Sequence, residues 1–283
     1  MITNSTIDKS WHGKLNLVYA SCQNSTQLIY NHHQAPFKVQ RPFYPEGQEI
    51  CHTVILHTAG GIVGGDRLTS DIHLQPHSQA LITTAAASKI YRSHGLLAKQ
   101  TVNIEVDDHA NLEYLPQETI LFNGAIYRQD LRVELAPGAS YLGWEIIRFG
   151  RSARGEKFLA GEMRSHTEIW QNNMPLWIDR QIVPGNEEVF YSPHGLGGKP
   201  VIATLVFLGF PIESEIIKQA RLLITEPLFS GVTKLEHGLL CRYRGHSTSS
   251  ARKWFINIWQ MLRTKCLNHD IIPSNHIPRV WQI

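Results

Sequence analysis

The chain has 283 residues, of which 42% are hydrophobic and 18% charged, and its formal net charge at pH 7 is +3. These values are typical of a globular protein and exclude a disordered or fibrous chain. A charge this small provides no general attraction to nucleic acid or to anionic membranes, so neither is expected as a partner.

Cysteine usage and the N-terminal sequence indicate a cytoplasmic protein. The four cysteines are widely spaced and form no CxxC pair, so neither a disulfide framework nor a zinc motif is expected. Residues 1–10 lack the basic and apolar segments of a secretory signal, and we expect a short flexible tail before one domain at 11–283. The longest apolar run, 201–210, is about half as long as a membrane span.

Strand-like alternation of apolar and polar residues dominates from residue 11 to about residue 180. Three segments share a pattern of two apolar residues, a turn and a second apolar strand; they are 71–84, 103–116 and 132–145. In this pattern Ile72, Ile104 and Val133 occupy the same position, at intervals of about 30 residues. The recurrence predicts stacked rungs, with a weaker fourth copy at 166–179, whereas an antiparallel meander is the alternative.

After residue 200 the periodicity becomes helical. The segments at about 213–225 and 246–268 each place apolar residues on one helical face, and 234–245 has the pattern of a hairpin. The predicted fold class is therefore mainly β, a β-helical or stacked-strand architecture with two α-helices in the C-terminal half.

A glycine-rich stretch, HTAGGIVGGDRL at 57–68, contains Gly60, Gly61, Gly64 and Gly65. A phosphate-binding loop would place lysine and a hydroxyl residue after the last glycine, where this chain has Asp66 and Arg67. The dinucleotide fingerprint G-x-G-x-x-G is also absent from this stretch. We predict a tight turn with close backbone approach, and a ligand loop is the alternative.

Other residue patterns define weaker candidates. Five carboxylates lie on strand segments, and a pair of them in one groove would suit sugar chemistry, with solvated faces or ion pairs as the alternative; they are Glu113, Glu118, Glu145, Glu162 and Glu168. The 15 histidines form no H-E-x-x-H or paired Cys/His motif, so no fixed metal site is predicted. Arg148, Arg151 and Arg154 form a basic loop suited to an anion or an acidic partner, or simply to solvent.

Six sequence blocks occur in an order and spacing that cover nearly the whole chain. They are GGIVGGDRL at 60–68, ITTAAASKIYRS at 82–93, LEYLPQETILFNGA at 112–125, GWEIIRFGRSARGE at 143–156, LFSGVTKLEHGLLCRYRG at 228–245 and PRVW at 278–281. Together they resemble the family of the urease accessory protein UreD, also called UreH. The chain departs from that family's usual pattern at Thr58, Ala59 and 85–87.

The resemblance implies a non-enzymatic scaffold for urease maturation with the mostly β, stacked fold of that family. Such proteins form a complex with UreF and the GTPase UreG, dock on the apo-urease subunits and help nickel reach the active site. GTP chemistry then belongs to the partner, which agrees with Asp66 in the glycine loop. No tightly bound cofactor is expected, only transient nickel, and the resemblance leaves open a dimer of such complexes and any metal ligands.

Within this interpretation, scattered polar residues line or shape a route for the ion, because weak oxygen donors can release it. The candidates are Asp66, Ser88, Lys89, Glu118, Glu145 and Glu168, with Arg67 in the same motif; ion pairs between rungs are the alternative. The partner-interface candidates are Trp259, Trp281, Arg148, Arg151 and Arg154, and packing of the helices is the alternative for the tryptophans. The rival function is a β-solenoid carbohydrate-active enzyme with paired strand carboxylates.

Overall fold

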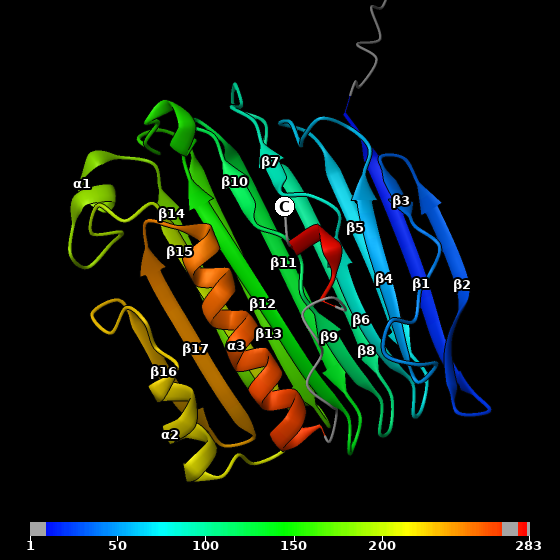
Figure 1. Cartoon of the computed structure of the whole chain (residues 1–283). Helices are drawn as coiled ribbons and strands as arrows, with labels where there is room; N and C mark the ends of the chain where they lie inside the picture. The colour runs from blue at the N-terminus through cyan, green and yellow to red at the C-terminus, as the bar shows by residue number, and fades with distance from the viewer. Residues whose placement is uncertain (1–9, 268–276, 282–283) are drawn as a thin grey trace, which may run out of the picture.

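Two β-sheets stacked face to face make up most of the protein, and helices lie on one of them (Figure 1). The computed structural model describes residues 10–267 and 277–281. The expected tail at 1–10 therefore lies almost entirely outside the described residues. Strands outnumber helices by far, so the prediction of a mainly β fold is confirmed.

The first sheet, sheet A, has the strand order β14-β13-β11-β8-β5-β1-β2. Its strands are β1 (His12–Cys22), β2 (Ser25–Gln34), β5 (Arg67–Leu74), β8 (Ala98–Val106), β11 (Ile126–Leu135), β13 (Glu162–Gln171) and β14 (Met174–Pro184). The five inner strands run parallel, whereas β2 and β14 at the two edges are antiparallel to their neighbours.

The second sheet, sheet B, has the order β16-β17-β15-β12-β9-β6-β4-β3, and two short strands, β7 and β10, extend it beside β12. Its strands are β3 (Phe37–Val39), β4 (Ile50–His57), β6 (Gln79–Thr84), β7 (Ser88–Ile90), β9 (Asn111–Tyr114), β10 (Thr119–Leu121), β12 (Ser140–Phe149), β15 (Val201–Leu208), β16 (Ser230–Leu235) and β17 (Gly238–Gly245). The apolar run near residue 205 forms β15, and β16 with β17 forms the predicted hairpin.

Each of the three predicted repeats contributes one strand to each sheet, as β5 with β6, β8 with β9 and β11 with β12. Ile72, Ile104 and Val133 pair directly across adjacent parallel strands. All three side chains are buried in the core between the sheets. In-register apolar side chains are the pattern that buried parallel strands require. The prediction of stacked rungs is therefore confirmed, and the meander is excluded.

The rungs turn at one shared position in the stack. His77, His109 and Gly138 lie there in the left-handed backbone region, with φ of 62°, 57° and 72°. The imidazole rings of His77 and His109 stack with their centroids 5.4 Å apart, and the missing side chain of Gly138 leaves room for the ring of His109. Most residue types adopt the left-handed conformation only at a cost in conformational free energy. These turns therefore fix where each rung crosses from one sheet to the other.

The fourth copy, at 166–179, continues the stack in sheet A only. Ile169 pairs with Val133 in the same apolar ladder. Asn172 and Asn173 both have positive φ, which is the geometry of a two-residue hairpin turn. The chain consequently returns as the antiparallel strand β14 in the same sheet, and the parallel stack ends there.

The two predicted helices are present as α2 (Ser214–Leu222) and α3 (Thr248–Cys266). α3 begins at the N-cap Ser247, whose side chain accepts a hydrogen bond from the Ser250 amide, and it packs on β12 and β15 of sheet B. A short helix that the sequence did not indicate, α1 (Glu187–Tyr191), follows β14. Among the residues described, no helix combines the length and apolar character needed to cross a membrane.

The buried ladder predicts the effect of shortening one of its side chains. Ile104→Ala should lower the free energy of unfolding by about 2–5 kcal/mol, because it leaves a cavity between two neighbouring rungs. Asn103→Ala, on the exposed face of the same strand, should change it by less than about 1 kcal/mol. Urea denaturation of the two variants checks this, and equal losses would contradict the in-register core.

Candidate functional site: a polar cavity between the sheets

The glycine loop between β4 and β5 is a tight turn packed against β7 and the residues that follow it. The Ile62 amide donates to the Lys89 carbonyl, and a Cβ on Gly61 would lie 2.7 Å from that same oxygen. Gly65 has φ of +101°. The glycines therefore permit close backbone approach and a left-handed turn, as predicted.

Asp66 holds this turn closed from inside. Its buried carboxylate accepts hydrogen bonds from the Trp11 amide at 2.8 Å and from the Val63 amide at 2.9 Å. The guanidinium of Arg67 donates to backbone carbonyls of the same region, including that of Leu97. Both residues thus shape the loop, and neither lines the cavity described next.

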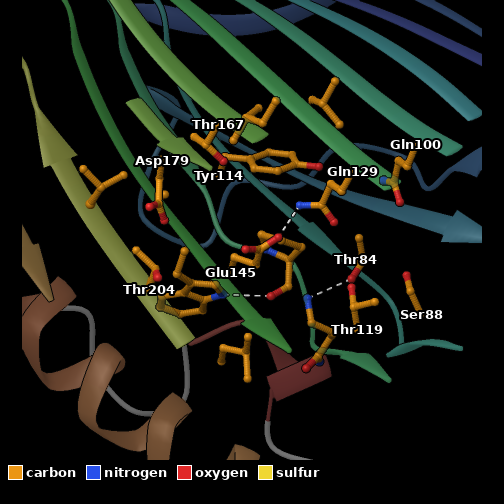
Figure 2. Close-up of a pocket in the computed structure, with 18 of the residues that line it drawn as sticks. Thr84, Ser88, Gln100, Tyr114, Thr119, Gln129, Glu145, Thr167, Asp179 and Thr204 are labelled. Carbon is orange, nitrogen blue, oxygen red and sulfur yellow. Dashed lines mark hydrogen bonds between the residues drawn. The ribbon is translucent and has the colours of Figure 1, made fainter. Parts of the chain in front are cut away.

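A small polar cavity lies between the two sheets and is lined by side chains of both (Figure 2). Its volume of about 70 Å³ is enough for a few water molecules. The polar residues around it include Thr84, Ser88, Gln100, Gln129, Glu145, Thr167, Asp179 and Thr204. Such a group of polar side chains inside a β stack is unusual, because buried polar groups are costly unless they are hydrogen-bonded.

Glu145 of β12 is the acidic centre of the cavity. Its carboxylate accepts a hydrogen bond from the amide of Gln129 (Figure 2). It also accepts one at 3.4 Å from the hydroxyl of Ser165. Burial, together with the negative charge of Asp179, raises the pKa of Glu145 to about 7, although the hydrogen bonds from Ser165 and Gln129 lower it. The carboxyl group therefore exchanges its proton near neutral pH.

Two larger hollows adjoin the cavity. A groove of about 550 Å³ at the glycine loop shares Thr84, Ser88, Gln100 and Tyr114 with it, and is also lined by His57 and Lys89. A groove of about 670 Å³ between β14 and the β16–β17 hairpin shares Thr204, and its basic lining residues include Arg180, Arg242 and Arg244. The polar cavity thus shares lining residues with both grooves.

The predicted polar candidates fall into different places. Ser88 and Glu145 line the cavity, and Lys89 lines the groove at the glycine loop. Glu118 instead pairs with Arg252 of α3. Glu168 lies on the outer face of sheet A, where Arg132 contacts it at 3.0 Å. For these last two residues the structure shows ion pairs, the alternative left open by the sequence.

A buried ion cluster that the sequence did not indicate attaches α3 to sheet B. Arg263 is fully buried, contacts Glu113 of β9 at 2.8 Å and also pairs with Glu46. His52 lies 2.6 Å from the other oxygen of Glu46. Removing one member of such a cluster leaves an uncompensated charge, which costs about 3–5 kcal/mol. The cluster therefore fixes α3 on the sheet.

The two interface tryptophans are buried in the chain. The indole of Trp259 donates to Glu113 at 2.8 Å, and that of Trp281 donates to Thr83 at 2.9 Å. Their rings pack edge to face with centroids 5.3 Å apart. The structure thus shows the packing alternative for both, and direct contact with a partner stays a prediction.

The three arginines of the basic loop have different surroundings. Arg148 donates to the His246 carbonyl, and Arg151 forms a bidentate pair with Glu156. Arg154 is exposed. Their role as partner contacts stays a prediction. Among the described residues, no group of three His, Cys, Asp or Glu side chains is arranged to hold a metal ion.

Sequence reasoning missed Asp179, Gln100 and Gln129 of the cavity. The sequence did contain a signal for this cavity, because Gln129 occupies an inward-facing position of its strand, where apolar residues are the rule. Gln100 and Ser165 pair with it in register on the two neighbouring strands. A polar residue in the buried phase of successive repeats is the pattern that indicates this cavity.

Comparison with known proteins now assigns the family. The family described as "UreD urease accessory protein" matches residues 12–282. The chain belongs to the UreD family. The urease accessory protein UreD of Nostoc punctiforme is 66% identical over 283 residues, which is 100% of both chains. The UreD of another Nostoc species is 67% identical over 282 residues, again 100% of both.

More distant relatives agree with this assignment. The UreD of Synechocystis is 41% identical over 268 residues, covering 93% of this chain and 99% of the relative. UreD membership confirms the resemblance seen in the sequence blocks and supports a role in urease maturation. The relatives are named accessory proteins, which fits a protein without enzymatic activity.

The raised pKa of Glu145 predicts a pH dependence of stability. Folding favours its protonated form, so its contribution to stability is complete below the ordinary value of 4.5 and is lost as the pH rises through about 7. Wild-type stability should therefore fall more steeply between about pH 5 and pH 8 than that of Glu145→Gln. Urea denaturation across this range measures it, with the exposed Glu105→Gln as the control that keeps the wild-type slope. Identical slopes for Glu145→Gln and wild type would contradict it.

Proposed function

We propose that this UreD-family chain is a non-enzymatic scaffold for nickel insertion into urease. It acts in a complex with UreF and the GTPase UreG that docks on apo-urease. The observation that supports this most strongly is a family match over nearly the whole chain combined with a polar cavity inside a β stack. The glycine loop is closed by Asp66, so GTP chemistry falls to the partner.

The cavity supplies the chemistry for passing a nickel ion. Glu145 offers a carboxylate whose pKa is about 7, so it is only partly ionised at neutral pH. Neutral oxygen donors such as Gln129 and Thr167 surround it. Nickel is held by imidazole and oxygen ligands, and a set with few charges binds it weakly enough for release. A carboxylate that also takes up a proton can exchange that proton for the ion.

The polar cavity and the two grooves that adjoin it define the proposed route. The ion enters at the groove beside the glycine loop, where His57 and Lys89 line the wall. It passes Ser88 and Glu145 in the cavity and leaves through the groove beyond Thr204. Turns packed without side chains, such as that at Gly61, keep the first groove open against β7. The partners then dock at the two mouths of this route.

A carbohydrate-active enzyme would need paired carboxylates in an open groove. Glu145 and Asp179 do line one hollow, but its volume of about 70 Å³ is room for a few water molecules and not for a sugar. The amide of Gln129 and the guanidinium of Arg242 already engage the two carboxylates. The scaffold is therefore the function that the geometry supports best.

The route is tested by neutralising its carboxylate. Glu145→Gln keeps the shape of the side chain and one oxygen acceptor, but it loses the negative charge and the exchangeable proton. Urease activation at limiting nickel should therefore fall by at least about tenfold, which corresponds to about 1.4 kcal/mol of free energy. The readout is urease activity in cells that carry the urease genes and this variant, with recovery at excess nickel.

The control is Glu168→Gln, a carboxylate on the outer face of sheet A that pairs with Arg132 and faces away from the cavity. It should leave activation near the wild-type level. Affinity purification with UreF, UreG and apo-urease is measured in parallel for both variants. Full activation by Glu145→Gln in an intact complex would refute the route, and normal urease activity after deletion of this gene would refute the scaffold itself.

A further inference from the structure

The outer face of sheet A carries an ordered separation of charge. In the described part of the chain the long helix α3 packs on sheet B, and sheet A forms the opposite layer with this face uncovered (Figure 1). Outward-facing residues of neighbouring strands pair without a shift and form rows that cross the strands. We number these rows 1 to 4 from the beginning of the parallel strands to their end.

Row 1 is cationic on four adjacent strands: it holds Arg67, Lys99, Arg128 and Arg164. Row 4 is acidic in the middle of the same sheet, where Glu105 of β8 pairs in register with Glu134 of β11. Like charges directly opposite each other on neighbouring strands are destabilising. Each end of this face therefore gains stability when opposite charge covers it.

Contacts within the chain relieve only part of this repulsion. Asp130 contacts both Lys99 at 3.0 Å and Arg128 at 2.8 Å, and Glu162 contacts Arg164. One carboxylate thus serves two cations. At the other end Glu134 pairs with Arg132, and no ion pair of Glu105 is seen among the described residues. An excess of positive charge stays in row 1 and of negative charge in row 4.

The rows are complementary to themselves when one copy is turned end over end. A two-fold axis between rows 2 and 3, running across the strands, places row 1 of one copy over row 4 of another. On β8, Lys99 then faces Glu105 of the second copy, and on β11 Arg128 faces Glu134 of the second copy. Rows 2 and 3 follow the same rule, because Asp130 faces Arg132 of the second copy.

We propose that this face is a docking surface for a second copy of the chain, and that two copies pack through their sheets A as a symmetric dimer. A two-fold contact uses the same patch on both copies, so each favourable pair occurs twice. On strand β13 the same axis brings Arg164 opposite Trp170 of the second copy, an aromatic ring that Arg132 already contacts within the chain in cation–π geometry. The inference goes beyond the proposed function and does not depend on it.

The separation of charge also argues against other occupants. Rows 1 and 4 are six residues apart along a strand, or about 20 Å. Nucleic acid or an anionic membrane large enough to cover the face would meet the carboxylates of row 4 as well as the cations of row 1. A short acidic segment from another protein would cover row 1 and leave the repulsion between Glu105 and Glu134 unrelieved.

The size of the face fits a weak dimer. The four strands that carry the rows, at a spacing of about 4.8 Å and with seven residues each, give roughly 450 Å² per copy, a little over half of the 800 Å² or so of a standard interface. Because most of the pairs are ionic, association should weaken as salt rises. Two sheets that pack face to face in this way keep their strands nearly aligned, as this axis requires.

A charge-swap experiment on the full-length chain tests the dimer by sedimentation equilibrium. The wild type should dimerise at about 0.1 M salt and dissociate at about 1 M, where the Debye length falls from about 10 Å to about 3 Å. Lys99→Glu and Glu105→Lys should each raise the dissociation constant by at least about tenfold. The double variant Lys99→Glu/Glu105→Lys restores opposite charges at both symmetric contacts and should dimerise again.

The control is Lys234→Glu on the edge strand β16, an exposed reversal away from this face that should leave the dimer unchanged. Thermal unfolding of each variant verifies that the monomer is intact. A monomeric wild type at low salt overturns the proposal, and so do single variants that still dimerise. A swapped variant that stays monomeric also overturns it, since an acidic partner of another kind predicts that outcome.

Discussion

The unshifted register between neighbouring parallel strands is the constraint on which the rest of the structure depends. Because β5, β8, β11 and β13 pair residue for residue, a residue type repeated at one strand position becomes a row across sheet A. The inward-facing residues in register with Ile104 are apolar and form part of the core between the sheets. The row that contains Gln100 and Gln129 leaves polar groups between the sheets, and these must be satisfied by other polar groups or by water. The cavity around Glu145 follows from that requirement.

The same register groups residues on both faces of sheet A, and the consequence differs between the inner and the outer face. Inside, polar side chains from successive rungs meet a carboxylate from sheet B, and burial brings the pKa of Glu145 close to neutral pH. Outside, charges of one sign gather at one end of the strands. In the function that we propose, a UreD-family protein built in this way offers an interior passage and an exterior contact surface. The helical layer held by Arg263 and Glu113 closes the outer face of sheet B.

The sequence predicted the architecture well because repeated apolar spacing reports directly on stacked strands. The rung positions Ile72 and Ile104, the two late helices and the glycine turn were all correctly predicted. The site was predicted only in part, since the residues around Glu145 come from strands far apart in the chain. The spacing of apolar residues shows which side chains of a strand face the core, but it does not show which residues of the other sheet they meet. For that reason Asp179 was missed, and Trp259 was expected at a surface although it donates to a buried carboxylate.

If nickel reaches urease through the cavity between the sheets, as we propose, then filling that cavity should prevent its delivery. Thr204 lines both the cavity and the adjoining groove, so Thr204→Trp should block the passage, while Thr101→Trp on the outer face serves as the control. The measurement is the nickel content of purified urease after activation by complexes whose assembly is verified. We expect urease nearly free of nickel with Thr204→Trp and normally loaded with Thr101→Trp. Full nickel content with Thr204→Trp in an assembled complex would contradict it.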